Sequence, residues 1–161
     1  MILDIGAGSG RDAAPLAGQG HVVVAVEPTP ELRALSQQIH GDQDFEWVDD
    51  SLPEMRVLCS RGRRFDLILR TAVWMHLDEP QRSLAMQSIA NMLAPECRVV
   101  LSLRHGPVPA GRRMFDVSAH ETIQLARAHG LTVVHHSERE DPHARRGVRW
   151  SHLGWQQETA A

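Results

Sequence analysis

The sequence predicts an α/β fold, a three-layer sandwich built on a mostly parallel, seven-stranded sheet. Short apolar segments alternate with segments of helical periodicity along most of the chain. Residues 21–26 read His-Val-Val-Val-Ala-Val, a continuous run that is typical of a strand buried on both faces. No helical segment separates the last two strand signals, so we expect an antiparallel C-terminal hairpin at the edge of the sheet.

The first element is a short strand that leads into a glycine-rich turn. Residues 2–5 are mostly apolar, and Gly6, Gly8 and Gly10 follow at two-residue spacing. Residues 11–17 then predict the start of a helix. A strand that turns through glycines into a helix N-terminus lets a ligand touch the backbone closely.

The next helix has clear boundaries. Thr29 is a favourable N-cap, Pro30 is a favourable first helical residue, and Gly41 ends the helix. We then expect a short strand over residues 45–48, a weak helix over residues 54–60 and a fourth strand over residues 65–69.

A longer helix begins at Asp78 and Pro80, and Pro95 closes it. Its apolar positions recur at helical spacing and are Met86, Ile89, Ala90 and Leu93. We expect a strand over residues 98–103 and a Gly/Pro-rich loop over residues 104–117. Long loops of this kind are usually functional or disordered. A helix follows between a Ser118–Glu121 capping box and Gly130. The last expected elements are strands over residues 131–135 and 148–153, which the polar residues 137–147 join.

Composition excludes several classes of function. The 161 residues form one expected domain, residues 1–161, with 42% hydrophobic and 23% charged residues. A net charge of −3 gives no support for nucleic-acid binding, and no apolar run approaches the ~20 residues of a membrane span. Cys59 and Cys97 lack metal-ligand spacing, and no signal peptide is recognisable. We therefore expect a cytoplasmic protein with reduced cysteines.

Ligands of an open parallel sheet bind beyond the carboxyl ends of the strands. That rule brings five segments around one cleft, namely residues 4–10, 27–28, 49–51, 70–76 and 104–116. Glu27 ends the second strand, and a carboxylate there can accept hydrogen bonds from both hydroxyls of a ribose. Nicotinamide enzymes use the same position, so Glu27 does not discriminate between nucleotide cofactors. The alternative is a solvated acid at a strand end.

The glycine spacing, by contrast, distinguishes a dinucleotide site from other nucleotide sites. The dinucleotide fingerprint places glycine at its first, third and sixth positions, whereas the sixth position here is Arg11. The pattern Asp4-x-Gly6-x-Gly8-x-Gly10 instead resembles the first motif of class I S-adenosylmethionine (AdoMet) dependent methyltransferases. The run Phe-Asp-Leu-Ile-Leu-Arg-Thr-Ala-Val-Trp-Met-His-Leu at residues 65–77 resembles their fourth-strand motif. The alternative is a tight turn with glycines for geometry alone.

This resemblance covers nearly the whole chain and implies a Rossmann-like fold of the small, stand-alone bacterial type. It also implies a cofactor site at the strand ends. The implied residues are Asp4 near the cofactor ammonium, with Gly6, Gly8 and Gly10; Glu27 and Pro28 at the ribose; Asp49, Asp50 and Ser51 at the adenine edge, with Asp50 favoured; and the backbone carbonyl of Arg70 or Thr71 at the ammonium. The alternative at each position is a structural role in a polar strand-end turn.

The chain departs from the family pattern in two places. The family usually has one or two helices before the first strand, which cover the cofactor, whereas Met1 already lies in the expected strand. We therefore expect either a truncated start or a cover supplied by a partner, such as a second copy in a homodimer. The usual Pro-Gly-Gly turn before the fifth strand reads Pro95-Glu96-Cys97.

The acceptor side of the cleft has weaker signals. The resemblance suggests that Trp74 covers the adenine or the acceptor, and the alternative is a core residue. In the long loop, Arg104, Arg112 and Arg113 are suited to bind a carboxylate or phosphate, and His105 is a weak candidate for accepting a proton. The alternative is a solvated loop with incidental arginines, because all 17 basic residues of the chain are arginine.

The sequence thus predicts an AdoMet-dependent methyltransferase that acts on a small-molecule acceptor and has no metal site. The sulfonium of AdoMet already activates its methyl group, so in-line positioning of the acceptor is the main task of the protein. One alternative is a non-catalytic AdoMet-binding or interaction module, and a weaker one is a nicotinamide-dependent oxidoreductase. Neither a membrane nor a nucleic-acid partner is expected.

Overall fold

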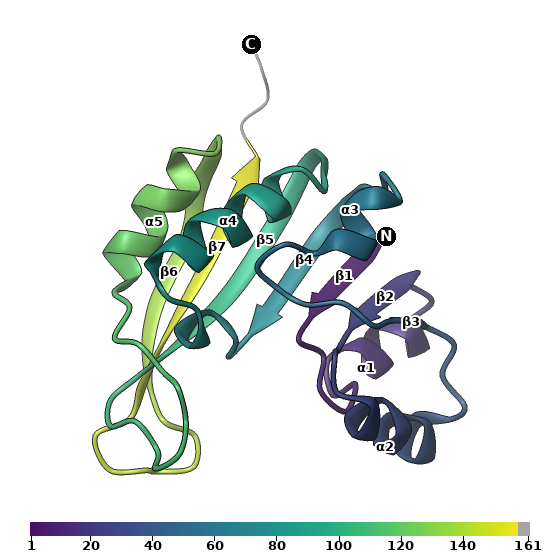
Figure 1. Cartoon of the computed structure of the whole chain (residues 1–161), viewed down its shortest axis with the longest axis horizontal. Coiled ribbons are helices and arrows are strands. Elements are labelled where there is room, and N and C mark those ends of the chain that lie inside the picture. The colour runs from purple at the N-terminus through teal and green to yellow at the C-terminus, as the bar shows by residue number, and fades with distance from the viewer. Residues whose placement is uncertain (158–161) are drawn as a thin grey trace.

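The computed structural model describes residues 1–157, which form a seven-stranded sheet in the order β3-β2-β1-β4-β5-β7-β6 (Figure 1). The expected domain of residues 1–161 includes 158–161, which lie outside the described residues. The strands are β1 (Ile2–Ile5), β2 (Val23–Val26), β3 (Glu46–Val48), β4 (Phe65–Thr71), β5 (Leu93–His105), β6 (Leu131–Glu140) and β7 (Arg149–Gln157). Strands β1 to β5 are parallel, and β7 lies antiparallel between β5 and β6. The mostly parallel sheet with its antiparallel C-terminal hairpin is thereby confirmed.

Helices cover both faces of this sheet. They are α1 (Ala13–Gly18), α2 (Pro30–His40), α3 (Arg56–Ser60), the short 3₁₀ helix η1 (Trp74–His76), α4 (Glu79–Ala90) and α5 (Ala119–Arg127). Leu3 and Ile5 belong to the larger core cluster with Met86 of α4, and Ile2 belongs to the smaller cluster with Ala13 of α1. Because neighbouring residues of a strand point to opposite faces, β1 is buried from both sides. Within the described residues, no helix is long and apolar enough to cross a membrane.

The boundary between α4 and β5 differs from the prediction. Helix α4 begins after Asp78, which forms a complete capping box, and ends at Ala90. Leu93 begins β5 and pairs with Phe65, so it is a strand residue and not the last apolar position of a helix. Pro95 lies within β5, at an irregularity in the β4–β5 pairing, and does not close the helix. Leu93 is buried, and a buried apolar residue suits a helix or a strand equally well, which is why its type misled the prediction.

The C-terminal hairpin is longer than predicted. Residues 137–140 were expected in a polar connection, but they pair with β7 as part of β6. Strand β6 is an edge strand, and one side of an edge strand faces solvent. Its polar residues therefore have the composition of a loop. At the other end of the chain, α1 begins two residues later than predicted, at Ala13.

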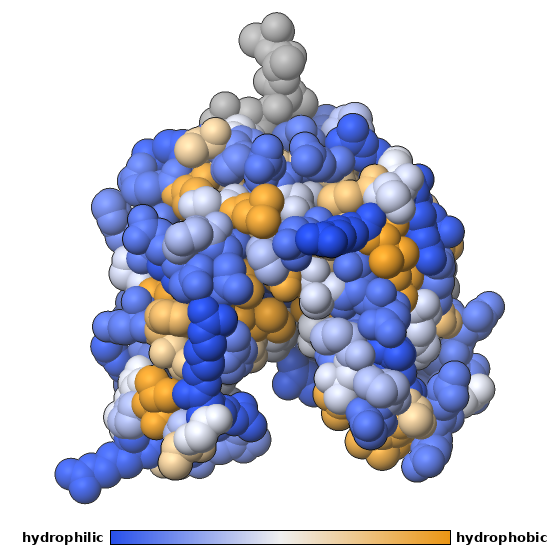
Figure 2. Space-filling model, in the orientation of Figure 1, coloured by the Kyte–Doolittle hydropathy of each residue, from blue (hydrophilic) through white to orange (hydrophobic). Residues whose placement is uncertain are grey.

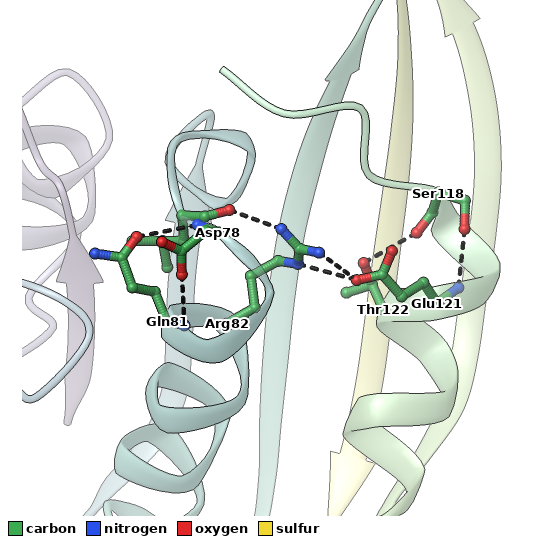
Figure 3. A network of polar contacts seen from close by, with 7 residues as sticks. Asp78, Gln81, Arg82, Ser118, Glu121 and Thr122 are labelled. Carbon is green, nitrogen blue, oxygen red and sulfur yellow. Dashed lines mark hydrogen bonds and ion pairs between the residues drawn. The ribbon is translucent and has the colours of Figure 1, made fainter. Parts of the chain in front are cut away.

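An ion pair between Arg82 and Glu121 joins α4 to α5 (Figure 3). Arg82 is buried, and it donates through Nη1 to the carbonyl oxygen of Leu77 at 2.7 Å and through Nε to the carboxylate of Glu121 at 3.0 Å. The hydroxyl of Ser118 accepts from the backbone N–H of Glu121 at 3.0 Å. The predicted Ser118–Glu121 capping box is therefore only half formed, because the Glu121 carboxylate binds Arg82 instead of returning to the N-cap.

Candidate active site

Two cavities open at the carboxyl ends of the parallel strands and meet at Gly6. The first, about 240 Å³, lies over β1 and β2 and reaches Glu27, Asp50 and Leu77. The second, about 270 Å³, lies between the glycine loop and the end of β4, and Asp4 contributes to its lining. Figure 2 shows the surface hollowed between two lobes at this edge of the molecule. Figure 1 assigns one lobe to α2 and the other to the loops after β5 and β6.

Gly6 has to be a glycine for two reasons. Its φ is +71°, a left-handed conformation that side chains disfavour. A Cβ atom built on it would lie 2.4 Å from Cγ2 of Val73. The missing side chain therefore allows the turn after β4 to approach the glycine loop, and this contact is where the two cavities adjoin.

Asp4 is a buried carboxyl group in the second cavity. Only 2% of the residue is exposed, and its Oδ2 has no hydrogen-bond partner within residues 1–157. Burial raises the pKa of Asp4 to about 7; the negative charge of Asp12 adds to this effect, and the positive charge of Arg11 opposes it. A carboxyl group with a raised pKa and a free oxygen in a cleft is suited to receive a cation.

Glu27 lies at the end of β2, and each oxygen of its carboxylate accepts a hydrogen bond from the backbone. Its Oε2 accepts from the N–H of Gly8 at 3.0 Å, and its Oε1 accepts from the N–H of Thr29 at 2.9 Å. Glu27 is 7% exposed and lines the first cavity together with Pro28. Each carboxylate oxygen retains a second lone pair, so Glu27 can accept further hydrogen bonds from a ligand.

The three adenine-edge candidates are not equivalent. Asp50 and Ser51 line the first cavity. The carboxylate of Asp50 accepts from the N–H of Ser51 at 2.9 Å and from the N–H of Leu58 at 3.0 Å, which fixes the turn before α3. The side chain of Asp49 is 70% exposed and lies 3.4 Å from Arg33, outside this lining.

Thr71 and Arg70 also lie in different surroundings, one at a cavity and the other in the core. Thr71 lines the second cavity, and its hydroxyl donates to Oδ2 of Asp12 at 3.1 Å. The next residue, Ala72, has a φ of +56°, and its N–H donates to the hydroxyl of Ser102 at 3.1 Å. Sequence reasoning missed Asp12 and Ser102. A serine inside the apolar strand β5 was the available signal for Ser102. Arg70 points into the core instead.

The structure corrects the prediction for Trp74. Its side chain has no exposed surface and lies in the larger core cluster, 4.0 Å from the guanidinium carbon of Arg70. Trp74 therefore covers neither of the two cavities, because η1 turns its ring inward. Val73 and Leu77, on either side of η1, line the first cavity instead. The segment of residues 70–76 was expected around the cleft, but neither Val73 nor Leu77 was named as a site residue, because apolar side chains carry no chemical signal.

The four polar residues predicted for the acceptor lie outside the described linings of both cavities. Arg104 donates to the carbonyl of Pro107 at 2.9 Å, and Arg113 pairs with Asp78 at 2.8 Å. Arg112 is exposed. Nε2 of His105 lies 2.8 Å from the hydroxyl of Ser151, and burial lowers the pKa of His105.

Arg104 and His105 belong to β5 and not to the predicted loop. The loop of residues 106–118, which carries Arg112 and Arg113, is nevertheless joined to the site. Phe115 donates its N–H to the carbonyl of Met75 in η1 at 2.8 Å, and Nδ1 of His76 lies 2.8 Å from the carbonyl oxygen of Arg113. Both contacts join the loop to the turn that follows β4. That turn supplies Ala72 to one cavity and Val73 to the other.

Comparison with known proteins gives three kinds of likeness. Residues 1–136 match the model of a family described as a methyltransferase domain. Over 101 residues the chain is 32% identical to the ubiquinone biosynthesis O-methyltransferase of Azorhizobium caulinodans, a match that covers 63% of this chain and 39% of that protein. The chain thus spans about two fifths of the curated relative that it matches.

Several solved structures share the fold. The 1,6-didemethyltoxoflavin-N1-methyltransferase of Burkholderia thailandensis, with bound 1,6-didemethyltoxoflavin and S-adenosylhomocysteine, is 25% identical and has a TM-score of 0.77, covering 98% of this chain and 71% of that one. The magnesium protoporphyrin IX methyltransferase of Synechocystis PCC 6803, with bound AdoMet, has the same TM-score at 16% identity and covers 98% of this chain and 70% of that one. The N-methyltransferase NodS of Bradyrhizobium japonicum WM9, in complex with S-adenosylhomocysteine, has a TM-score of 0.75 at 20% identity and covers 98% of this chain and 78% of that one.

Proposed function

Because the chain belongs to the methyltransferase domain family, we propose that it uses AdoMet to methylate a small-molecule acceptor. The observation that carries the proposal is the pair of cavities that meet at Gly6. AdoMet has a nucleoside half and an amino-acid half, and the two cavities differ in chemistry in the same way. The solved relatives with bound AdoMet or S-adenosylhomocysteine support the same cofactor.

The first cavity suits the nucleoside half. Glu27 offers acceptors for the ribose hydroxyls, and the carboxylate of Asp50 offers acceptors to the exocyclic amine at the adenine edge. Val73 and Leu77 supply apolar contact for the base. We assign the adenine to Asp50 and Ser51 and leave out Asp49, whose side chain faces solvent.

The second cavity suits the amino-acid half. The unpartnered Oδ2 of Asp4 fits an ammonium group, and the backbone of the glycine loop is open there, since a Cβ on Gly8 would meet nothing within 4 Å. Thr71 and Ala72 bring backbone groups of the β4 end to the same cavity. We assign the carbonyl role to Thr71 and not to Arg70.

The chemistry that AdoMet supplies when bound is a sulfonium methyl group ready for direct transfer. The residues of this chain bind and orient the cofactor, exclude water and position the acceptor. We place the acceptor beside the second cavity, where the loop of residues 106–118 contacts η1. His105 lies outside both cavity linings, its Nε2 contacts the hydroxyl of Ser151, and burial lowers its pKa, so we assign it no proton transfer.

The ribose assignment has a direct test. Replacing Glu27 by Ala removes the acceptor oxygens, and we expect S-adenosylhomocysteine to bind at least about tenfold more weakly by calorimetry, or roughly 1.4 kcal/mol. The matched control is Glu31→Ala, which removes an exposed carboxylate from the first turn of α2. Equal affinities of the Glu27→Ala variant and wild type would contradict the assignment.

A further inference from the structure

Arg70 is a buried cation without an acceptor. It is 1% exposed, and none of its three guanidinium nitrogens has a hydrogen-bond partner within residues 1–157. The ring of Trp74 lies against it, and Nε1 of that ring is also without an acceptor. Of the eight buried side-chain nitrogen and oxygen atoms without a partner in the described part of the chain, four belong to these two residues.

All four atoms are nitrogens that donate hydrogen bonds, so the partner they lack is an acceptor. The arginine side chain stays protonated in proteins, and a buried charge without a counter-charge is strongly unfavourable. The face of Trp74 attracts the cation but supplies no lone pair to its N–H groups. The planar fork of a guanidinium matches the two oxygens of a carboxylate or phosphate, and the indole N–H adds one more donor.

The position of this pair relates it to the site. Thr71 and Ala72, which follow Arg70, line the second cavity, and Val73 before Trp74 lines the first. The segment of residues 72–78 therefore both covers Arg70 and forms part of the site. We call it the cover turn.

The cover turn has polar contacts at both ends and in the middle. At its C-terminal end the carbonyl of Leu77 accepts from Arg82, and Asp78 caps α4 and pairs with Arg113. Ser102 accepts from Ala72 at the other end, and the loop after β5 contacts Met75 and His76 in the middle. Its only helix is η1, which has three residues. Moving the turn aside does not require a strand or a long helix to unfold, but it removes the buried side chain of Trp74 from the larger core cluster. By contrast, Arg113 is already paired with Asp78, so its charge is compensated.

We propose that Arg70 binds an anionic group of the methyl acceptor, a carboxylate or a phosphate, when the cover turn moves aside. The inference rests on the proposed function, because it assigns the anion to the acceptor of that reaction. It limits the substrate class to acceptors that carry one such group. It also makes the cover turn the element that responds to both the cofactor and the acceptor.

The test uses thermal unfolding of the purified chain with sodium benzoate or sodium phosphate, each against sodium chloride at equal ionic strength. Benzamide serves as the uncharged counterpart of benzoate. We expect at least one of the two anions to raise the Tm of wild type by several degrees, and benzamide to leave it unchanged. The same shift has to persist with saturating S-adenosylhomocysteine, whose own carboxylate would otherwise be the natural partner of Arg70.

Three variants test whether the anion-induced shift in Tm depends on Arg70. Arg70→Leu abolishes the shift and raises the Tm without ligand, because an apolar side chain replaces an unpaired buried charge. Arg70→Lys keeps the charge but not the fork, and its shift is smaller than that of wild type. Arg146→Leu, the control at an exposed arginine of the β6–β7 loop, keeps the full shift.

Several results would overturn the inference. These are no shift of wild type with either anion, an equal shift in Arg70→Leu, a lower Tm of Arg70→Leu without ligand, and a shift that S-adenosylhomocysteine abolishes. A titration of wild type with S-adenosylhomocysteine separates the two claims. Binding of that ligand without an anion response removes this inference alone. An anion response without such binding removes the acceptor assignment together with the proposed function.

Discussion

The carboxylate of Glu27 and the backbone N–H of Gly8 form a hydrogen bond of 3.0 Å, which joins the end of β2 to the glycine loop after β1. The second oxygen of the same carboxylate holds the N–H of Thr29, the N-cap of α2. One side chain thus fixes two backbone segments that border the first cavity. The site is held in shape by the residue that we assign to the ribose.

Replacing Glu27 by Gln tests this structural role without a ligand. The amide has one acceptor oxygen in place of two, so either Gly8 or Thr29 keeps an unpaired N–H. We expect the free energy of unfolding in urea to fall by about 1–3 kcal/mol. Glu31→Gln, at an exposed position of α2, should change it by less than about 0.5 kcal/mol. Equal stability of the two variants would show that the bonds of Glu27 do not hold the loop.

The raised pKa of Asp4 predicts that stability falls as pH rises. The folded chain keeps a proton on Asp4 up to a pH of about 7, whereas the unfolded chain loses it near about 3.9. Between these values the folded state binds more protons, so the free energy of unfolding decreases with rising pH, by up to roughly 4 kcal/mol in total. Urea unfolding at a series of pH values measures this slope. Asp4→Asn should flatten it, and an unchanged slope would contradict the burial argument.

The same carboxyl group predicts how ligand affinity depends on pH. An ammonium group favours the ionised form of Asp4, so its binding expels the proton below the pKa. We expect calorimetry to show that S-adenosylhomocysteine binds more tightly as pH rises towards about 7 and that its affinity levels off above that pH, with a slope of at most about tenfold per pH unit. The control, 5′-methylthioadenosine, lacks the ammonium group and should not follow this trend. A matching trend for both ligands would place the titrating group elsewhere.

The ion pair between Arg82 and Glu121 predicts a measurable coupling between α4 and α5. Arg82 is buried, but the side chain of Glu121 is 43% exposed, so solvent weakens the pair. We expect Arg82→Ala to lower the free energy of unfolding by about 2 kcal/mol, since the Leu77 carbonyl also loses its donor. A double-mutant cycle with Glu121→Ala should give a coupling of about 1 kcal/mol. A coupling near zero would mean that the helices are held by apolar packing alone.

In the loop of residues 106–118, adding a methyl group should destabilise the fold more at Gly106 than at Gly111. Its φ is +108°, and a Cβ there would lie 2.1 Å from the carbonyl oxygen of Gly147 in the β6–β7 loop. Gly111 also has a positive φ, but its Cβ would meet nothing within 4 Å. Gly111→Ala should therefore show only backbone strain of about 1–2 kcal/mol, and Gly106→Ala should unfold at a clearly lower urea concentration. Similar losses would show that the two loops do not rely on this contact.

Much of the fold followed from periodicity, because a strand buried on both faces and a capped helix each leave a local pattern. Residues 23–26 and the Thr29–Pro30 helix start are examples. The prediction failed where a residue type suits two environments. Leu93 is apolar in a helix or a strand, and the polar end of β6 has the composition of a loop.

At the site, the charged strand ends were predictable because topology places them at one edge. Asp4, Glu27 and Asp50 all reach a cavity. The roles of Val73, Leu77 and Ser102 depend on how the turn after β4 folds against the glycine loop, which no local pattern encodes. For the same reason Trp74 was expected to cover the adenine or the acceptor, whereas the alternative, a core residue, is what the structure has.

The central claim is that the two cavities at Gly6 hold one molecule of AdoMet. The most direct measurement is a calorimetric titration of the purified chain with AdoMet and with S-adenosylhomocysteine, with NADH as the control nucleotide. We predict saturable binding of both sulfur compounds at one per chain and no heat from NADH. No binding of either sulfur compound, or binding of NADH alone, would contradict the account.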